Sequence, residues 1–233
     1  MNLGWRNAYV GVFEAKIDGI TFYFIDNEYY FNGQMPYSDV VWDTEKFAYF
    51  CKAALSCLPL IDFRPDVIHC HDWQASLIPV YLKTFFQGDP FFQGIKTILT
   101  IHNIRFQGTW NVGHLKWVSG LPSECFKPGL LVSPYQDTSY PESEWTASML
   151  RGGLVYCDYI TTVSNSYAEE IKTPQFSDGL DDILKARVFD PLAIRASYDP
   201  RRIVPAQDLA DGYSVRGIFP PRLRYDAAAL AAR

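Results

Sequence analysis

Three short apolar segments of this chain each end in residues that can donate, accept or exchange protons. The residues that follow the segments are His69-Cys70-His71-Asp72-Trp73, His102-Asn103 and Ser164-Asn165. These positions hold three of the four histidines of the chain. Imidazole, carboxylate and amide groups gathered at one place can hold hydroxyl groups and stabilise a charge that develops during a reaction. The three clusters therefore form one candidate site if the fold brings the segment ends together.

A metal centre is one alternative for this site, because His69, His71 and Asp72 are residue types that bind transition metals. We expect no metal, since no further carboxylate or cysteine stands at the other two segment ends to complete a ligand set. A structural alternative also stays open. In it the histidines belong to a hydrogen-bonded core and Asp72 caps the helix that follows.

Other catalytic and nucleotide-binding motifs are missing from the sequence. A serine hydrolase of the α/β type needs Gly-x-Ser-x-Gly, and phosphate-binding loops need Gly-x-Gly-x-x-Gly or Gly-Lys-Ser/Thr. The chain has none of these. Gly152-Gly153 falls inside a helical pattern, which indicates close helix packing rather than phosphate binding.

Aromatic residues around the segment ends favour a sugar ligand. Sugar rings present apolar C–H faces and hydroxyl edges, so a site for them pairs flat aromatic rings with short polar side chains. Beside Gln107-Gly108, the candidate rings are Tyr29, Tyr30, Tyr37, Trp73, Phe106 and Trp110. Each ring taken alone is more often part of a core, because proteins bury much of their aromatic area.

Strand and helix patterns alternate around the candidate site. Apolar periodicity predicts strands at 66–69, 96–101 and 159–163, and helices at 74–86 and 143–156. This alternation predicts an α/β fold with parallel strands and right-handed crossovers. Ligands in such sheets bind beyond the carboxyl ends of the strands, so the three clusters are expected at one edge.

The flanking segments carry weaker local signals. Asp18-Gly19 between two β-rich runs predicts a hairpin of 11–17 and 20–25, followed by a loop at 27–33. Asp43 is expected to cap a helix that runs to about residue 58, and Ser166 with Glu169 predicts a capping box. The stretch 106–142 shows no periodic element, and loops of that length are often functional.

Composition limits the classes of protein that fit. The chain has 233 residues, 48% of them hydrophobic, and a formal net charge of −5, which argues against a disordered chain and against nucleic acid as the main ligand. No apolar run reaches about 18 residues, and the first residues lack the apolar segment of a secretory signal. Five scattered cysteines without a CxxC predict buried free thiols in a reducing compartment, so we expect a cytoplasmic protein, or a stromal one if the source is a plant.

Several motifs occur along the chain in the same order as in one known protein family. Residues 69–75 resemble the H-x-H/N-D-W-H-x motif of bacterial glycogen synthases and plant starch synthases. Residues 100–108 resemble their T-x-H-N-x-x-Y/F-Q-G motif, and residues 161–171 their T-T-V-S-P-x-Y-A-x-E-I segment. Residues 24–31 and 179–181 also fit. The chain is thus similar to this family of ADP-glucose-using glucan synthases, glycosyltransferase family 5, from about residue 10 to residue 187.

The resemblance implies a fold and a reaction. Members have the GT-B fold, in which two Rossmann-like domains face a cleft, and they move glucose from ADP-glucose to the non-reducing end of an α-1,4-glucan with retention of configuration. The family uses no metal or other cofactor. Positive side chains and helix N-termini neutralise the diphosphate leaving group instead.

The same resemblance assigns roles to individual residues. It implies that His102 and Asp72 are catalytic: His102 holds the sugar hydroxyls, and Asp72 orients hydroxyls or favours an oxocarbenium-like state. Substrate binding is expected from six further residues, which are Asn103, Gln107, Tyr37, Trp73, His71 and Ser164. Gln74 and Asn165 depart from the family pattern, which usually has histidine and proline there.

Two larger pieces of the family pattern are missing. The chain starts after the Lys-x-Gly-Gly-Leu loop that binds the donor, and the C-terminal Rossmann domain is absent. We therefore interpret 1–187 as a partial N-terminal, acceptor-side domain that is inactive on its own. Residues 188–233 hold seven of the twelve arginines and none of the nine lysines. We interpret them as a divergent tail, disordered or frameshifted, with no clear strand and the end of a helix at 227–232.

Three alternatives to a glucan synthase fragment stay open at this point. A non-catalytic glucan-binding remnant would keep the aromatic loops without the reaction. A GT-B enzyme using another nucleotide sugar would keep the site residues, because the nucleotide-reading residues lie in the missing domain. The product of a broken gene would expose apolar surface and aggregate.

Overall fold

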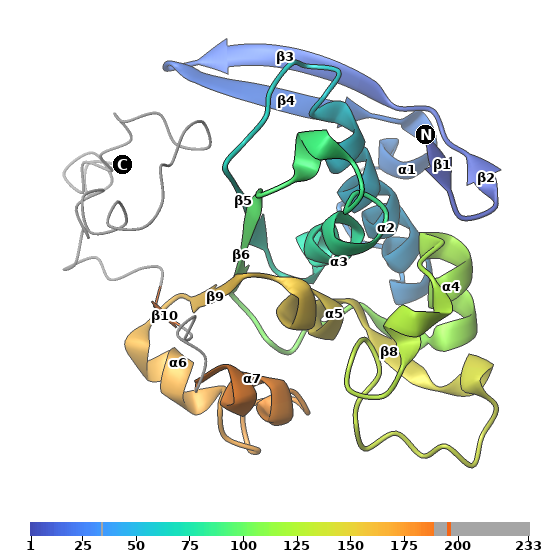
Figure 1. The fold of residues 1–233 in the computed structure, drawn as a ribbon, viewed down its shortest axis with the longest axis vertical. Helices are drawn as coiled ribbons and strands as arrows, with labels where there is room; N and C mark the ends of the chain where they lie inside the picture. The colour runs from blue at the N-terminus through green and yellow to red at the C-terminus, as the bar shows by residue number, and fades with distance from the viewer. Residues whose placement is uncertain (34, 189–194, 197–233) are drawn as a thin grey trace.

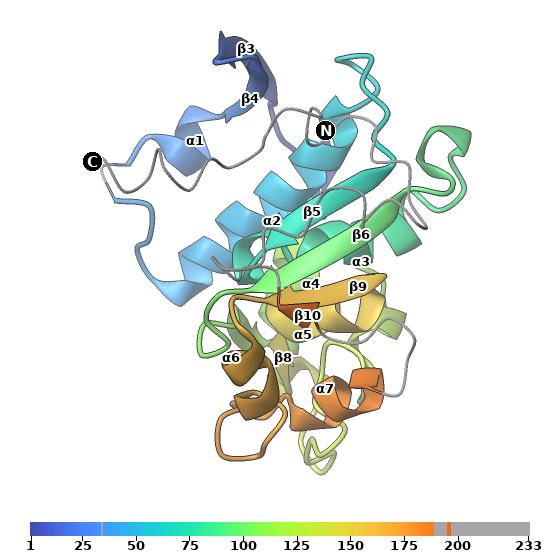
Figure 2. The same cartoon turned by 90° about the vertical axis from the view of Figure 1, so that its left-hand side faces the viewer.

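A four-stranded parallel sheet forms the centre of the chain (Figures 1 and 2). The computed structural model describes residues 1–33, 35–188 and 195–196. The strands lie in the order β10-β9-β6-β5, with bounds β5 Val67–His71, β6 Lys96–Ile101, β9 Tyr159–Thr162 and β10 Arg195–Ala196. All three neighbouring pairs are parallel. The predicted α/β class is therefore confirmed.

Three helices pack together beside this sheet: α2 (Val40–Cys57), α3 (Leu77–Thr84) and α5 (Met149–Tyr156). Cys70, Leu99 and Ile160 lie in register on one face of the sheet and are almost fully buried in the main core. Gly153 in α5 comes so close that an added Cβ would lie 2.7 Å from the Ser76 Cβ and 2.9 Å from the Leu99 Cδ2. The close packing predicted for this glycine pair is confirmed.

Side chains alternate between the two faces of a strand, so the register also defines the opposite face. His71 pairs with Thr100, and Thr100 pairs with Thr161. His69 lies two positions before His71 on the same strand. These four side chains therefore share the face that points away from Leu99 and the helices.

Smaller elements surround the sheet. The hairpin of β3 (Gly11–Ile17) and β4 (Ile20–Asp26) turns at Asp18 and Gly19, whose φ angles are 52° and 79°, as the Asp-Gly signal predicts. The remaining strands and α-helices are β1 (Asn2–Leu3), β2 (Arg6–Asn7), α1 (Glu28–Phe31), β7 (Thr109–Asn111), α4 (Val112–Ser119), β8 (Thr146–Ser148), α6 (Asn165–Glu170) and α7 (Asp181–Val188). Short 3₁₀ turns lie at Trp73–Ala75, Pro90–Phe92, Ser123–Phe126 and Glu142–Glu144.

Two predicted helix caps were wrong. Asp39, four residues before Asp43, caps α2 by accepting a hydrogen bond from the Trp42 N–H at 2.9 Å. Asp43 is buried in the first turn and pairs with Lys46 at 2.8 Å. At α6 the cap is Ser164, whose Oγ accepts from the Tyr167 N–H at 3.1 Å, and not Ser166.

Other local predictions differ from the structure to different extents. Residues 27–33 contain α1, capped by the Asn27 side chain, instead of an uninterrupted loop. The stretch 106–142 contains β7, α4 and a 3₁₀ turn, and the helix expected from residue 143 begins only at Met149, because 146–148 pair with β7. The helix predicted at 74–86 is confirmed as α3, which a 3₁₀ turn precedes.

All five cysteines are free and buried, as predicted. In the described part of the chain, no helix has the length and apolar character needed to cross a membrane. The prediction that the tail holds no strand was wrong, since Arg195–Ala196 pair with β9 as β10. The predictions of disorder and of a helix end at 227–232 fall outside the described residues.

Candidate functional site

Asp72 joins the ends of the two central strands β5 and β6. Its carboxylate Oδ1 accepts hydrogen bonds from the backbone N–H groups of His102, at 2.8 Å, and Asn103, at 3.2 Å. Its own N–H donates to the Thr100 carbonyl at 2.9 Å. The Asp72 backbone has a φ of 54°, which is costly for a residue with a side chain and is typical of functional sites. Asp72 thus fixes the loop that carries His102, and its side chain makes no cap bond to the turn that follows.

His71 and His102 face each other across the strand ends. The His71 Nδ1 lies 3.0 Å from the His102 Nε2, so one nitrogen carries the proton and the other accepts it. Partial burial lowers the pKa of His71 below its usual value, and the nearby His102 lowers it further. The contact between the two rings therefore holds the His102 ring in a fixed orientation against His71.

His69 lies behind this pair on the same face of the sheet. Its ring centroid is 4.3 Å from that of His71, and its Nε2 lies 2.6 Å from the Thr100 Oγ1. The Thr100 Oγ1 in turn lies 2.6 Å from the Thr161 Oγ1. Burial, with a smaller effect of His71 and His102, lowers the pKa of His69 to about 4. His69 is therefore neutral near pH 7 and supports the two outer histidines.

The remaining predicted residues lie around the loop that follows β6. The Asn103 Oδ1 accepts from the Arg105 N–H at 3.1 Å, which folds the start of the loop. The Gln107 side chain donates to the Asp178 carbonyl at 2.9 Å, which ties the loop to the segment before α7. Ser164, as the cap of α6, follows the neighbouring strand β9.

Trp73 and Tyr37 lie on the α2 side of this loop. Trp73 is only 6% exposed, meets Phe47 edge to face and packs under Gly108, where an added Cβ would lie 2.3 Å from the indole. Trp73 therefore packs against the loop that follows β6 and supports it. Tyr37 is 54% exposed and accepts a hydrogen bond from the Gln74 side chain at 3.0 Å.

Contacts thus join His71, Asp72, His102 and Asn103 directly, whereas Gln107, Tyr37, Trp73 and Ser164 lie around them. The family resemblance assigned no role to His69, Gln74 or Thr100, although His69 belongs to the candidate cluster at the end of the first segment. The two-residue spacing of His69 and His71 was a usable signal, since it places both rings on one face of a strand. Thr100 could be found only from the register of β5 and β6.

Within 1–33, 35–188 and 195–196, no three or more histidine, cysteine, aspartate or glutamate side chains are arranged to hold a metal ion. The fourth histidine, His114, lies apart from the site and joins α4 to α2 through Thr44 and the Val41 carbonyl.

Residues 1–186 match the starch synthase catalytic domain family. The chain belongs to this family. It is 54% identical over 187 residues to a glycogen synthase of Lachnospira eligens and 50% identical over 187 residues to one of Lachnoclostridium phytofermentans. Each alignment covers 80% of this chain and 37% of the relative. The family expected from the motifs is therefore confirmed, and the chain spans little more than a third of these relatives.

A solved member of the starch synthases has a similar structure. The catalytic domain of starch synthase IV from Arabidopsis thaliana, bound to ADP and acarbose, matches with a TM-score of 0.67 and 26% identity. The match covers 80% of this chain and 36% of that chain. The parallel sheet with its helices is therefore part of a starch synthase catalytic fold.

Proposed function

We propose that this chain forms the acceptor-side part of a glucosyltransferase site. In this proposal glucose moves from ADP-glucose to the non-reducing end of an α-1,4-glucan with retention of configuration. The observation that carries it is the Asp72 carboxylate bound to the backbone N–H groups of His102 and Asn103 at the sheet edge. Membership of the starch synthase family supports the reaction class, and the Arabidopsis relative is described as bound to ADP and acarbose.

The chemistry needs a carboxylate and hydrogen-bonding groups beside the sugar ring. When the bond from the anomeric carbon to the diphosphate breaks, positive charge develops on the sugar and negative charge on the leaving group. Among the described residues, the Asp72 Oδ1 accepts the hydrogen bonds from the His102 loop. In the proposal, Oδ2 is left to orient hydroxyls and stabilise the positive sugar ring. His102 uses Nε2 for His71, which leaves Nδ1 for a sugar hydroxyl.

Six other residues take supporting roles in the proposal. Asn103, Gln107 and Ser164 hold the loops at the strand ends, Trp73 packs beneath them, and Tyr37 lines the acceptor side. His71 keeps the His102 ring in place. No metal or other cofactor takes part in the proposed reaction.

We further propose that the 233-residue chain does not transfer glucose by itself. No lysine or arginine forms a hydrogen bond or ion pair with the Asp72 or His102 side chain in the described part of the chain, and a diphosphate leaving group needs positive charge nearby. We assign 1–187 to the acceptor-side domain and 188–233 to a divergent tail. The negative net charge and the buried free thiols support a cytoplasmic or stromal protein that does not bind nucleic acid.

A chimera tests the function. The matching segment of the Lachnospira eligens glycogen synthase is replaced by residues 1–187 of this chain, and ADP release is measured with glycogen and either ADP-glucose or UDP-glucose. We expect release from ADP-glucose, about a hundredfold loss in Asp72→Asn and His102→Ala, and no effect of Tyr135→Ala, an 82% exposed ring. A folded chimera without activity would overturn the function, and full activity of both site variants would overturn the site. ADP release by the chain alone would contradict its assignment as an incomplete unit.

A further inference from the structure

Tyr37 stands on a short segment that has no regular structure of its own. Residues 35–39 lie directly before α2 and form neither a helix nor a strand. A ring on such a segment can take many positions, and ordering it costs conformational entropy when a ligand binds. Because the Tyr37 side chain is exposed, contacts at its backbone, its ring edge and its hydroxyl decide whether it meets a ligand in one position.

An ion pair in the first turns of α2 holds the backbone on both sides of Tyr37. The Lys46 Nζ lies 2.8 Å from the Asp43 Oδ1 and donates a hydrogen bond to the Pro36 carbonyl at 2.5 Å. The Asp43 Oδ2 accepts a hydrogen bond from the Ser38 N–H at 3.1 Å. The two charged groups thus bind the residue before Tyr37 and the residue after it.

The burial of this pair distinguishes it from an ion pair on a helix surface. The Asp43 and Lys46 side chains are each 6% exposed, and charges removed from water are stable only when hydrogen bonds satisfy their remaining groups. Asp43 is not needed as the cap of α2, because Asp39 accepts the hydrogen bond from the Trp42 N–H. The hydrogen bonds that the pair makes beyond its own helix therefore go to the segment that carries Tyr37.

Gln74 holds the other end of the Tyr37 side chain. Its Nε2 donates a hydrogen bond to the Tyr37 hydroxyl oxygen at 3.0 Å, so the hydroxyl proton stays available for a ligand oxygen. The Gln74 carbonyl accepts a hydrogen bond from the buried Cys51 Sγ at 3.1 Å, which fixes Gln74 against α2. Since Gln74 follows Asp72 by two positions, its amide joins the Tyr37 hydroxyl to the site at the ends of β5 and β6.

Phe47 connects the Tyr37 ring to the same site. The Tyr37 and Phe47 ring centroids are 6.1 Å apart, and Phe47 meets Trp73 edge to face at 4.9 Å. The Lys46 Nζ lies 4.9 Å from the Phe47 ring centroid, so the ion pair and the ring contact support each other. Three separate sets of contacts therefore hold the backbone, the ring and the hydroxyl of Tyr37.

We propose that Asp43, Lys46 and Gln74 are positioning residues, which we call the Tyr37 clamp, and that they hold Tyr37 ready for the acceptor sugar. The proposal rests on the proposed function, in which Tyr37 lines the acceptor side. A ring that is already held in place loses little freedom when the acceptor binds, so the clamp increases the affinity for the acceptor. The clamp acts through Tyr37 and leaves the binding of the donor unchanged.

Amide hydrogen exchange in the full 233-residue chain, measured by NMR, tests the hold of the ion pair on the backbone. Asp43→Ala/Lys46→Met removes both charges together, so no unpaired buried charge is left. We expect the Ser38 amide to exchange about tenfold faster in this variant, and the Leu99 amide in β6, which reports opening of the sheet, to change less. Urea unfolding verifies that the variant is folded. Unchanged exchange at Ser38 in the folded variant would overturn the clamp.

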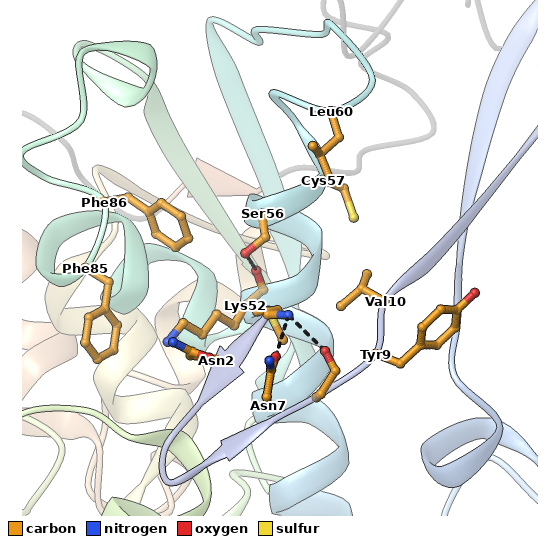
Figure 3. Close-up of a pocket in the computed structure, with 12 residues that line it drawn as sticks. Asn2, Asn7, Tyr9, Val10, Lys52, Ser56, Cys57, Leu60, Phe85 and Phe86 are labelled. Carbon is orange, nitrogen blue, oxygen red and sulfur yellow. Dashed lines mark hydrogen bonds between the residues drawn. The ribbon is translucent and has the colours of Figure 1, made fainter.

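Lys52 provides a matched control on the same helix. It is the other lysine of α2, and it lines a hollow of about 770 Å³ together with Ser56 and Phe85 (Figure 3). Its Nζ lies 4.1 Å from the Phe85 ring centroid, so Lys52→Met also removes a partly buried ammonium group. None of the clamp residues lines this hollow. Lys52→Met is expected to leave Ser38 exchange within about twofold of the unchanged chain, and an increase of about tenfold would contradict the clamp.

A double-mutant cycle in the chimera tests the hold of Gln74 on the hydroxyl. Gln74→Ala is expected to raise the KM for maltoheptaose about threefold, with kcat and the KM for ADP-glucose within about twofold. In a Tyr37→Phe background the same substitution should change the KM by less than about 1.5-fold, because the hydroxyl that Gln74 holds is already absent. Gln136→Ala is the matched control, since Gln136 is also half-buried and accepts from the Thr146 N–H in a loop away from Tyr37. It should leave both KM values unchanged.

The outcomes separate the clamp from the proposed function. Equal effects of Gln74→Ala with and without the Tyr37 hydroxyl would overturn the positioning role of Gln74 and leave glucosyl transfer supported. A rise in the KM for ADP-glucose as large as that for maltoheptaose would contradict an action on the acceptor side. A folded chimera without activity would overturn the proposed function and with it the acceptor role of the clamp. Ser38 exchange decides independently of activity whether the ion pair holds the segment of Tyr37.

Discussion

The Nδ1 of His71 lies 3.0 Å from the Nε2 of His102, so each imidazole orients the ring of the other. This contact joins β5 to the loop after β6, next to the bond from Asp72 to the same loop. His71→Phe would keep a ring but remove the partner of His102. In the chimera we expect kcat to fall about tenfold or more while the KM for ADP-glucose changes little, because the proposed role of His71 is to position His102. His71→Asn, which keeps a hydrogen-bonding group, is expected to lose less; equal losses would contradict the positioning role.

The depressed pKa of His69 predicts how stability depends on pH. The unfolded chain binds a proton at this histidine near pH 6.5, whereas the folded chain resists it until about pH 4. The unfolded state therefore binds more protons between these values, and stability falls as pH decreases through that window. From pH 7 to pH 5 the cost from His69 is about 2 kcal/mol. Urea unfolding of the unchanged chain and of His69→Gln at both pH values checks this, and parallel losses in the two proteins would contradict it.

Two substitutions of Asp72 separate the energetic cost of its backbone strain from the contribution of its hydrogen bonds. Asp72→Ala and Asp72→Gly both remove the carboxylate that holds the His102 loop, at a cost of about 1–3 kcal/mol. Glycine also tolerates the φ of 54°, so Asp72→Gly is expected to be more stable than Asp72→Ala by about 1 kcal/mol. Urea unfolding measures the difference. Both variants should lose activity in the chimera, and a more stable alanine variant would show that the strain is absent.

Gly108 lies against Trp73 and has a φ of 60°, so a side chain there is both strained and obstructed. An added Cβ would lie 2.3 Å from the indole. We expect Gly108→Ala to destabilise the chain by about 3 kcal/mol or more. Gly94→Ala is the matched control, because Gly94 has a φ of 80° but nothing within 4 Å of an added Cβ. It should cost only about 1–2 kcal/mol. Similar losses in thermal or urea unfolding would show that contact with Trp73 is unimportant.

Arg151 and Asp182 join α5 to α7 through a largely buried ion pair. The Arg151 side chain is 3% exposed and donates through both Nη atoms to the Asp182 carboxylate. Asp182→Ala would leave a buried positive charge without its partner, so we expect a loss of about 3–5 kcal/mol. The neighbouring Asp181→Ala breaks a pair with the half-exposed Lys185 and should cost about 1 kcal/mol or less. Equal effects in urea unfolding would contradict the difference in burial.

Local sequence signals predicted the elements that depend on neighbouring residues. The Asp18-Gly19 turn was predicted because turn residues act over a few positions. For the same reason the strands predicted at 66–69, 96–101 and 159–163 lie close to the observed 67–71, 96–101 and 159–162. The cap of α2 was assigned to Asp43 instead of Asp39 because two aspartates four residues apart give the same signal. The pairing of β7 with β8 joins segments 37 residues apart, from Thr109 to Thr146, and no local pattern encodes it.

The candidate site was predictable only in outline. The convergence of His71, Asp72 and His102 followed from the rule that strand ends share one edge of a parallel sheet. The bond from Asp72 to the backbone of two residues of the next loop depends on a positive φ that residue type alone does not predict. The support that His69 and Thr100 give to the site could be predicted only once the strand register was known. Trp73 was expected to bind substrate, and its burial could be predicted only once the position of Gly108 was known.

The alternation of side chains along β5 makes this strand intolerant of changes in length. Cys70 faces the helices, while His69 and His71 face the opposite side. Insertion or deletion of one residue within β5 would exchange the two faces, placing imidazoles against Leu99 and a thiol at the site. Substitution at the helix-facing positions alters packing without touching the histidines. Point mutations can therefore change the core of this sheet during evolution. A one-residue change in the length of β5 would instead disrupt both the core and the site.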